Sequence, residues 1–359
     1  MHSQQIQFST SADGVRIAYA TSGKGSPIVM VANWLTHLTH QWQDLAWRPW
    51  LQALSERHTL LRFDSRGCGL SDRDVPEISM DRWVQDLECV IDASGFDHFP
   101  LLGICQGGAV AIEYAARHPE RVSSLILYSA FARGRLKRAQ NPDQAAQQAE
   151  IARVTVDLAR LGWGQENHAY MRTFALMWQP GGTLENLRSW CELQRVTTTP
   201  DAAARSLRAG FETDVVESAR HIRCPTLVVH AERDQVVPIE EARILAAAIP
   251  GARFLQVNSE NHLPLPDEPA WKVFLDELDR FSQKSGRAQG GFAGISPRER
   301  EVLEAIAQGL DNAQIAARMG LSEKTVRNHV SHIFGKLLCE NRSQAIVRAR
   351  EVGFGNALR

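Results

Sequence analysis

The sequence predicts an α/β fold with a mostly parallel sheet, followed by a small all-α domain. Six short apolar runs have the pattern of buried strands, at 27–32, 58–63, 99–104, 122–128, 226–231 and 252–257. Helical patterns at 80–93, 107–117 and 239–248 lie between several of them. This alternation is typical of a parallel sheet with helices on both faces. The last 68 residues instead contain four short helical units with clear start and stop signals.

The composition is that of an ordinary globular protein, with 44% hydrophobic and 23% charged residues among 359. No apolar run approaches the ~18–20 residues that span a bilayer. The N-terminus lacks the basic and apolar regions of a secretory signal. The six cysteines form no C-x-x-C pairs, which argues against a disulfide scaffold or a structural zinc site. We therefore expect two or three domains in the cytoplasm, no membrane association, and neither metal nor cofactor.

The charge is unevenly distributed although the net charge is only −1. Residues 292–359 carry ten basic and seven acidic side chains, so this segment has a charge of +3 and the rest of the chain −4. A basic C-terminal segment favours an anionic partner there.

Two further segments organise the chain. Residues 282–291 are polar and glycine-rich, which predicts a flexible linker between domains at 1–281 and 292–359. Residues 131–222 lack strand signals, and Trp163, Phe174, Trp178 and Trp190 are among their aromatic side chains. We expect them to form a helical cap over the carboxyl edge of the sheet, where open α/β folds bind their ligands.

The four C-terminal helices are delimited by their capping residues. Ser296 and Glu299 form a capping box with Pro297 at the first helical position, and Gly309 ends that helix. The remaining start and stop signals are Asp311, Gly320, Ser322 and Asn341. The second and third helices are joined by a glycine-containing turn of three residues, which is the form of a helix-turn-helix.

The third helix is expected to read DNA. Val326, Val330, Ile333 and Leu337 recur at helical spacing and predict one buried stripe. The opposite face carries side chains suited to base contacts, namely Lys324, Thr325, Arg327, Asn328 and Ser331. Lys336 and Arg342 are expected to contact phosphates. The competing interpretation is a helical packing module with a solvated charged face.

The motifs at 296–303, 312–316, 322–330 and 341–345 together resemble the LuxR-type DNA-binding domain. That family usually has Lys where Arg327 stands, so the charge is retained. The resemblance implies binding of double-stranded operator DNA as a homodimer. A single module buries little surface, which also favours a dimer.

A second motif lies in the large domain, where the strand at 99–104 leads into Gly103-Ile104-Cys105-Gln106-Gly107. This is G-x-C-x-G between a strand and a helix, a nucleophile elbow with Cys in place of Ser. Asp234 and His262 each follow a later predicted strand, in the order nucleophile, acid, histidine. His262 would accept the Cys105 proton and Asp234 would orient the imidazole. Each residue alone has an ordinary structural explanation, and the combination favours a triad.

With the loop at 64–71, these segments resemble the α/β-hydrolase superfamily over residues 5–281, and the cysteine nucleophile is similar to that of the dienelactone hydrolases. The resemblance implies an oxyanion hole made by the backbone N–H groups of Leu35 and Gln106. Trp34 stands where the superfamily usually has glycine, which would narrow the pocket. We expect Asn33, Trp34, Trp163 and Trp178 to line that pocket, whose ligand could be an ester, a lactone or a carboxylic acid.

Two functions fit these features. The first is a transcription regulator whose hydrolase-like domain senses a small molecule, an architecture that resembles a known group of bacterial regulators. The second is an active cysteine-dependent esterase, lactonase or thioesterase that is tethered to DNA. Only the second requires multiple turnovers, and Trp34 at the oxyanion loop favours the first.

Overall fold

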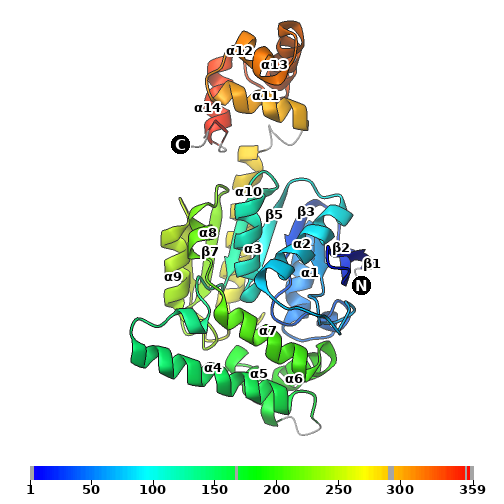
Figure 1. Cartoon of the computed structure of the whole chain (residues 1–359), viewed down its shortest axis with the longest axis vertical. Helices are drawn as coiled ribbons and strands as arrows, with labels where there is room; N and C mark the ends of the chain where they lie inside the picture. Colours follow the sequence, from blue (N-terminus) through cyan, green and yellow to red (C-terminus); the bar gives the residue numbers. More distant parts are fainter. Residues whose placement is uncertain (1–3, 166–168, 290–294, 352–353, 356–359) are drawn as a thin grey trace. The chain divides into compact units, whose positions relative to one another are not determined.

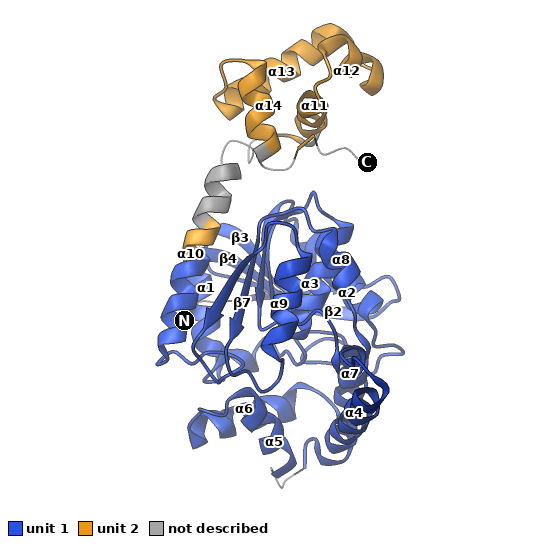
Figure 2. Cartoon of the chain, turned by 90° about the vertical axis from the view of Figure 1, so that its left-hand side faces the viewer, with its two compact units in different colours: residues 1–278 blue, residues 279–359 orange. Residues whose placement is uncertain are grey.

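The computed structural model describes residues 4–165, 169–289, 295–351 and 354–355. The chain divides into two compact units, at residues 1–278 and 279–359 (Figure 2). Within the described part of the chain, no helix is both long and apolar enough to cross a membrane.

The larger unit is built on one eight-stranded sheet with the order β1-β2-β4-β3-β5-β6-β7-β8. The strands are β1 (Gln5–Thr10), β2 (Arg16–Ser22), β3 (Ser26–Met30), β4 (His58–Phe63), β5 (Phe99–Ile104), β6 (Val122–Tyr128), β7 (Thr226–Ala231) and β8 (Arg253–Val257). The β1–β2 and β2–β4 pairs are antiparallel and the other five pairs are parallel. The six predicted strands are confirmed with small shifts at their ends. The first two were not predicted. β1 is almost entirely exposed and has no apolar run, whereas β2 is mostly buried and its short apolar run was overlooked.

Helices cover both faces of this sheet (Figure 2). On one face lie α1 (Trp47–Arg57) and α10 (Pro269–Gln289), and the ring of Trp50 packs 4.7 Å from Phe274 and 5.2 Å from Tyr128 of β6. On the other face lie α2 (Met80–Ser94), α3 (Gln106–Arg117), α8 (Val216–Arg220) and α9 (Ile239–Ala248). Both layers exclude water from the central strands, so all seven residues of β6 are buried.

The predicted flexible linker is wrong for residues 282–289, because α10 continues to Gln289. Its sequence there is rich in Gln, Lys, Arg and Ala, which have high helix propensity. One glycine in a helix interior costs only ~1 kcal/mol, so Gly286 does not end the helix. Residues 290 and 291 lie outside the described residues.

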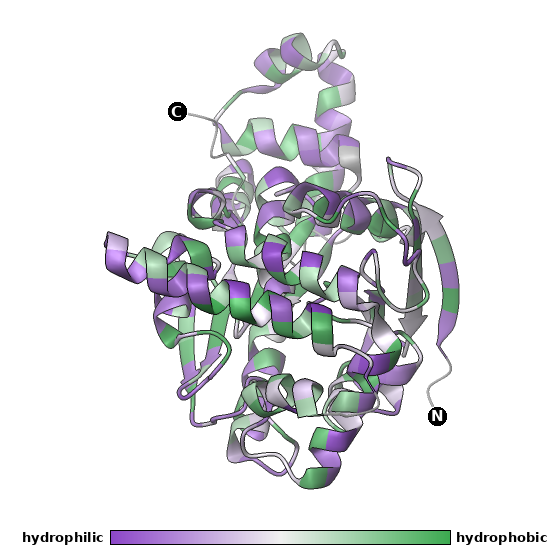
Figure 3. Cartoon of the chain, turned by 60° about the horizontal axis from the view of Figure 1, so that its bottom comes forward, coloured by the Kyte–Doolittle hydropathy of each residue, from purple (hydrophilic) through white to green (hydrophobic). Residues whose placement is uncertain are grey.

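The predicted helical cap is inserted between β6 and β7 and is coloured green in Figure 1. It contains α4 (Pro142–Gly162), α5 (Ala169–Trp178), α6 (Leu184–Thr197) and α7 (Pro200–Glu212). Hydrophilic and hydrophobic residues alternate along these helices, as expected for amphipathic elements that cover a core (Figure 3). The insertion was predicted to extend to residue 222, which is too far, because α8 packs against α3 and α9 in the sheet layer.

The smaller unit contains α11 (Pro297–Ala307), α12 (Asn312–Met319), α13 (Glu323–Leu337) and α14 (Arg342–Glu351). Ser296 with Glu299 and Asp311 with Gln314 form capping boxes, and Gly320 ends α12 in the left-handed conformation. The predicted stripe of α13 is confirmed, since Val326, Val330, Ile333 and Leu337 are all buried in the core of this unit.

Candidate active site and DNA-binding surface

Cys105 occupies a sharp turn between β5 and α3. Its φ of 52° and ψ of −121° are unusual for a residue with a side chain, and its N–H donates to the carbonyl of Tyr128. The turn requires small neighbours. A Cβ added at Gly108 would lie 2.4 Å from the Cβ of Ala130, and one at Gly107 would lie 2.8 Å from the carbonyl oxygen of Ala32. The local sequence therefore places a thiol at the N-terminus of α3, where the helix dipole favours its ionised form.

Asp234 and His262 come together from the loops after β7 and β8. The imidazole Nδ1 of His262 lies 2.7 Å from Oδ2 of Asp234, and both side chains are inaccessible to solvent. Oδ1 of Asp234 accepts the N–H groups of Val236 and Val237. The backbone N–H of His262 donates to the carbonyl of Trp178, whose ring lies 4.3 Å from the imidazole. The cap therefore contributes to holding the histidine in place.

Charge interactions favour the protonated form of His262. Burial by itself would lower the pKa of this imidazole, but the charges of Asp234 and Cys105 outweigh burial and raise the pKa above its ordinary value. Burial likewise opposes ionisation of Asp234, but the neighbouring His262 leaves the pKa of Asp234 below its ordinary value. Among the described residues, Nε2 of His262 has no hydrogen-bond partner of ordinary geometry. An imidazolium beside the sulfur can stabilise a thiolate and later donate its proton to a leaving group.

A second histidine lies behind the pair. Nε2 of His230 is 3.6 Å from Oδ2 of Asp234 and 3.0 Å from the carbonyl oxygen of Val237. Burial lowers the pKa of His230, which favours its neutral form. Neutral His230 donates to Val237 and supports the loop that carries Asp234. The sequence alone offered no motif for this position.

Cys105 opens onto a pocket of about 690 Å³, including its mouth to solvent. Trp34, Gln106 and Trp178 line it together with Cys105. The remaining lining residues, which sequence reasoning did not select, are Phe131, Gly134, Arg135, Arg138, Phe174, Met177, Leu207, Gly210, Phe211, Val236 and Val237. They come mainly from the cap and its flanking segments, where no sequence motif marks the residues that face the pocket. Within the described ranges, no group of three potential ligands could hold a metal ion.

The structure does not support two of the predicted pocket residues. Trp163 packs behind the pocket, with its ring 5.5 Å from that of Trp34 and its Nε1 donating to the carbonyl of Gln194. Asn33 lines a separate cavity of about 230 Å³, and the side chain of Leu35 lies against the same cavity. Trp34 lines both cavities, and its ring contacts that of Trp163.

Of the two predicted oxyanion donors, Gln106 lines the pocket with Cys105, whereas Leu35 lies against the separate cavity. Gln106 is the first residue of α3, so its N–H has no partner within the helix. Leu35 follows Trp34 in the loop after β3. Trp34 is buried and its ring packs against Phe174 and Trp178 at 5.6 Å and 6.3 Å. The indole therefore forms part of the wall beside the nucleophile.

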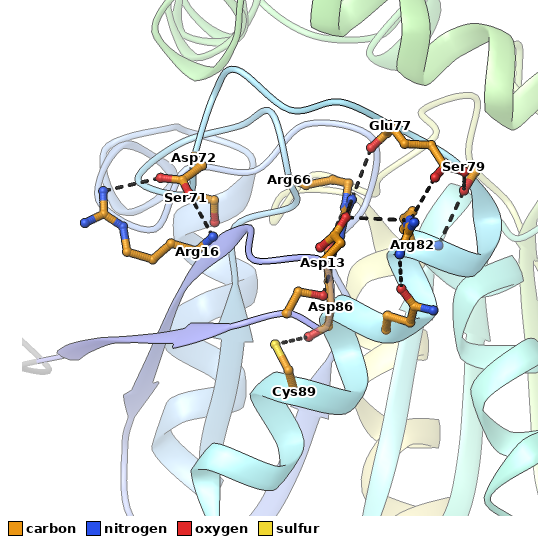
Figure 4. Close-up of polar contacts among 12 residues, drawn as sticks. Asp13, Arg16, Arg66, Ser71, Asp72, Glu77, Ser79, Arg82, Asp86 and Cys89 are labelled. Atoms are coloured by element: carbon orange, nitrogen blue, oxygen red, sulfur yellow. Dashed lines mark hydrogen bonds and ion pairs between the residues drawn. The ribbon is translucent and has the colours of Figure 1, made fainter.

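A buried ion-pair network supports the loop at 64–71. The guanidinium of Arg66 contacts both carboxylate oxygens of Asp86, at 2.8 and 2.7 Å, and both of Asp13, at 2.8 and 3.2 Å (Figure 4). These contacts join the β1–β2 turn, the loop after β4 and α2. The same loop meets the cap, because the hydroxyl of Thr198 donates to the carbonyl of Gly67. The network thus fixes one side of the cap relative to the sheet.

The predicted DNA-reading face of α13 is accessible. Lys324, Arg327, Asn328 and Ser331 are exposed on the side opposite the buried stripe. Thr325 is half-buried, and its hydroxyl lies 2.8 Å from that of Ser322 at the start of the helix. Thr325 therefore takes part in the N-cap.

The two predicted phosphate contacts are engaged inside the smaller unit. Lys336 Nζ lies 2.5 Å from Oε2 of buried Glu299, and this contact lowers the pKa of Glu299 to about 2. Arg342 donates to Oδ1 of Asn312 and to the carbonyl of Leu310. These contacts hold α13 and α14 to the rest of the unit, and the role of Lys336 and Arg342 at phosphates stays a prediction.

Comparison with known proteins agrees with both units. The family model described as alpha/beta hydrolase fold matches residues 38–269, and the model described as bacterial regulatory proteins, luxR family, matches residues 293–349. A protein of Azorhizobium caulinodans, provisionally named carbamate hydrolase RutD, is 29% identical over 249 residues, covering 68% of this chain and 87% of its own. GfsR of Streptomyces halstedii, provisionally named an HTH-type transcriptional regulator, is 54% identical over 123 residues, covering 32% of this chain and 51% of its own.

Solved structures show the same fold in the larger unit. The esterase EaEST from Exiguobacterium antarcticum superposes with a TM-score of 0.64 at 22% identity, covering 77% of this chain and 99% of that chain. The chain belongs to the α/β-hydrolase fold family and carries a C-terminal DNA-binding domain of the bacterial luxR family.

Proposed function

We propose that this DNA-binding regulator senses a small carbonyl compound in the cytoplasm by forming an acyl adduct with Cys105. The observation that carries the proposal is the buried His262–Asp234 pair next to a strained cysteine at the base of a pocket. The luxR-type domain on the same chain supplies the output. Ligand and DNA binding are coupled only if the ligand has different affinities for two states of the protein.

The chemistry follows from the groups present. The Cys105 thiolate attacks the carbonyl carbon of an ester, lactone or thioester, so a C–S bond forms and the carbonyl π electrons move to oxygen. The N–H groups of Gln106 and Leu35 would stabilise that oxyanion. When the carbonyl re-forms, the bond to the leaving oxygen or sulfur breaks and protonated His262 supplies its proton. Water, deprotonated by His262, then hydrolyses the thioester.

We expect turnover as a whole to be slow. The indole of Trp34 forms part of the pocket wall next to Cys105, and the loop that carries Leu35 has a bulky residue where a hydrolase usually has glycine. Loss of one oxyanion donor costs on the order of 10²–10³ in rate. A long-lived adduct would allow the occupied state to change DNA binding before the ligand is released.

On DNA, the exposed face of α13 would lie in the major groove. Arg327 and Asn328 are suited to guanine and adenine edges, and Lys324 to the guanine edge or the backbone. A homodimer would place two such helices on related half-sites. Arg327→Ala should weaken binding to a genomic fragment selected by the wild-type protein while leaving non-specific binding nearly unchanged. Equal affinity of both proteins for that fragment would refute the assignment.

The second candidate is a hydrolase with continuous turnover, which the complete triad favours. The two are separated by mixing the full chain with 4-nitrophenyl butyrate and following nitrophenolate release and intact mass together. A burst of about one equivalent with a persistent adduct supports the sensor, whereas continuous release without an adduct supports the enzyme. Cys105→Ala should abolish both signals, and Cys224→Ala, which removes a half-buried cysteine elsewhere, should not. An unchanged reaction in Cys105→Ala would refute both candidates.

A further inference from the structure

The pocket next to Cys105 contains two cationic side chains and no anionic one. Arg135 belongs to the short helix η2 (Arg135–Lys137) at the entrance to the cap, and Arg138 follows it. Every other lining residue is apolar, aromatic or uncharged. The two arginines therefore contribute a charge of +2 within walls that are mainly hydrophobic, and the Cys105 thiolate of the proposed mechanism would offset only one of these charges.

The protein neutralises these two charges only in small part. Nε of Arg138 donates to the carbonyl of Arg133 at 2.8 Å, and its nearest carboxylate oxygen, on Glu241, is 3.9 Å away. That carboxylate is already engaged by Arg133, through a side-chain contact of 2.9 Å and a backbone N–H contact of 2.8 Å. Glu241 therefore forms its close ion pair with Arg133, and Arg138 lies only at the margin of that pair.

Arg135 has a neutral partner. Its Nη1 donates to the side-chain oxygen of Gln148 at 2.9 Å, and among the described residues no carboxylate forms an ion pair with it. The guanidinium also lies over the ring of Phe211, as that of Arg138 lies over Phe131, each at 5.9 Å. Each guanidinium has five N–H donors, so most of the donors of both are available to a ligand.

Two incompletely paired cations in an apolar pocket carry an energetic cost. Burial lowers the pKa of both Arg135 and Arg138, which reflects the unfavourable transfer of their charge out of water. The faces of the two phenylalanine rings offset part of this cost. An anion that enters the pocket would offset more of it, because charge-assisted contacts are strongest where water is excluded.

We propose that the ligand is an amphipathic compound that carries a free carboxylate in addition to its ester, lactone or thioester carbonyl. The carboxylate binds Arg135 and Arg138, and the apolar or aromatic body lies against Trp34, Phe174 and Trp178. A carboxylate is favoured because its two oxygens match the planar fork of a guanidinium. The aromatic walls are suited to a hydrophobic body. The inference rests on the proposed function in that it names the class of compound the sensor binds.

The test compares two compounds that differ in charge and little in size. The full chain is titrated calorimetrically at pH 7.5 with 4-phenylbutyrate and with 4-phenylbutanamide. We expect the acid to bind at least about tenfold more tightly than the amide, the effect of one charge-assisted contact. Arg135→Gln and Arg138→Gln should each reduce this ratio, and the double variant should bring it near one.

Two further variants control for charge and for folding. Lys137→Gln removes an exposed positive charge between the two arginines in the sequence, outside the pocket lining, and should keep the acid-to-amide ratio. Arg138→Lys keeps a cation at the site and should retain part of the preference that Arg138→Gln loses. Circular dichroism spectra that match the wild type establish that each variant is folded.

Three results would overturn the inference: equal affinities for acid and amide in the wild type, an unchanged ratio in the double variant, or no binding of either compound at millimolar concentration. The titrations involve no acyl transfer. A preserved preference for the acid in a protein that never acylates Cys105 would therefore refute the covalent step alone. Acylation by a neutral ester without any preference for the acid would refute the carboxylate site alone.

Discussion

Replacing Asp234 with asparagine tests the electrostatics of the triad. The substitution removes a negative charge whose oxygen lies 2.7 Å from Nδ1 of His262, in a position where neither side chain contacts solvent. Two unit charges about 4 Å apart in an effective dielectric constant of about 20 attract by about 4 kcal/mol, which corresponds to about 3 pKa units. We therefore expect the pKa of His262, which is raised in the wild type, to fall to its ordinary range or below it.

The consequence should be visible at Cys105. Without an imidazolium next to it, the sulfur loses the cation that stabilises the thiolate, which is the reactive form. Alkylation of Cys105 by iodoacetamide at pH 7, measured by peptide mass spectrometry, should slow by at least about tenfold in Asp234→Asn. Peptide mapping separates Cys105 from the other five cysteines. Asp267→Asn, which removes an exposed carboxylate five residues after His262, serves as the matched control.

The pH dependence makes the test specific. At high pH hydroxide can deprotonate a thiol without a neighbouring imidazolium, so the two proteins should react at similar rates there. A difference in alkylation rate that persists at high pH would indicate that the substitution changes the access of iodoacetamide to Cys105. Equal rates at pH 7 would refute the argument that Asp234 controls the charge of His262.

Three further predictions concern stability and the elbow. Glu299→Gln keeps the capping box but removes the ion pair with Lys336. Because the pKa of Glu299 is lowered to about 2, the ion pair stabilises the folded state above pH 4.5, and this stabilisation is lost as the pH falls toward 2. Lys336 is partly exposed, so solvent screening reduces the expected loss in the variant to about 1–2 kcal/mol at pH 7. Calorimetry of the smaller unit's transition should show this loss at pH 7 and nearly equal stabilities near pH 2. Arg66→Met leaves Asp86 buried without its partner and should cost about 3–5 kcal/mol in urea unfolding, so a loss below ~1 kcal/mol would contradict a buried network. Gly108→Ala places a Cβ 2.4 Å from a neighbouring one, should cost about 1–3 kcal/mol and should slow acylation by 4-nitrophenyl butyrate; a normal rate would show that the turn tolerates the change.

The structure differs most from the sequence-based expectations where long-range contacts matter. Trp163 and Asn33 were expected in the pocket, but Trp163 packs against the ring of Trp34 and Asn33 lines a separate cavity. Lys336 was expected at phosphate because it is a cation near the recognition helix, and a glutamate 37 residues earlier in the chain engages it. Strand β1 is almost entirely exposed, has only Ile6 and Phe8 as large apolar residues, and is held by its pairing with β2. None of these contacts leaves a signal in local sequence.

What the sequence by itself determined is local or topological. Helix starts at Ser296, Asp311 and Ser322 follow from hydrogen bonds that span only three residues, and the buried strands follow from continuous apolar runs. The contact between Asp234 and His262 was predictable because parallel strands end at one edge of the sheet, and the proposed triad with Cys105 follows from the same topology. Only the tertiary structure decided which cap residues face Cys105 and which charges remain incompletely paired. The physical reason is that burial and pairing depend on every element packed around a side chain, and for Arg135 and Arg138 those elements lie across the pocket.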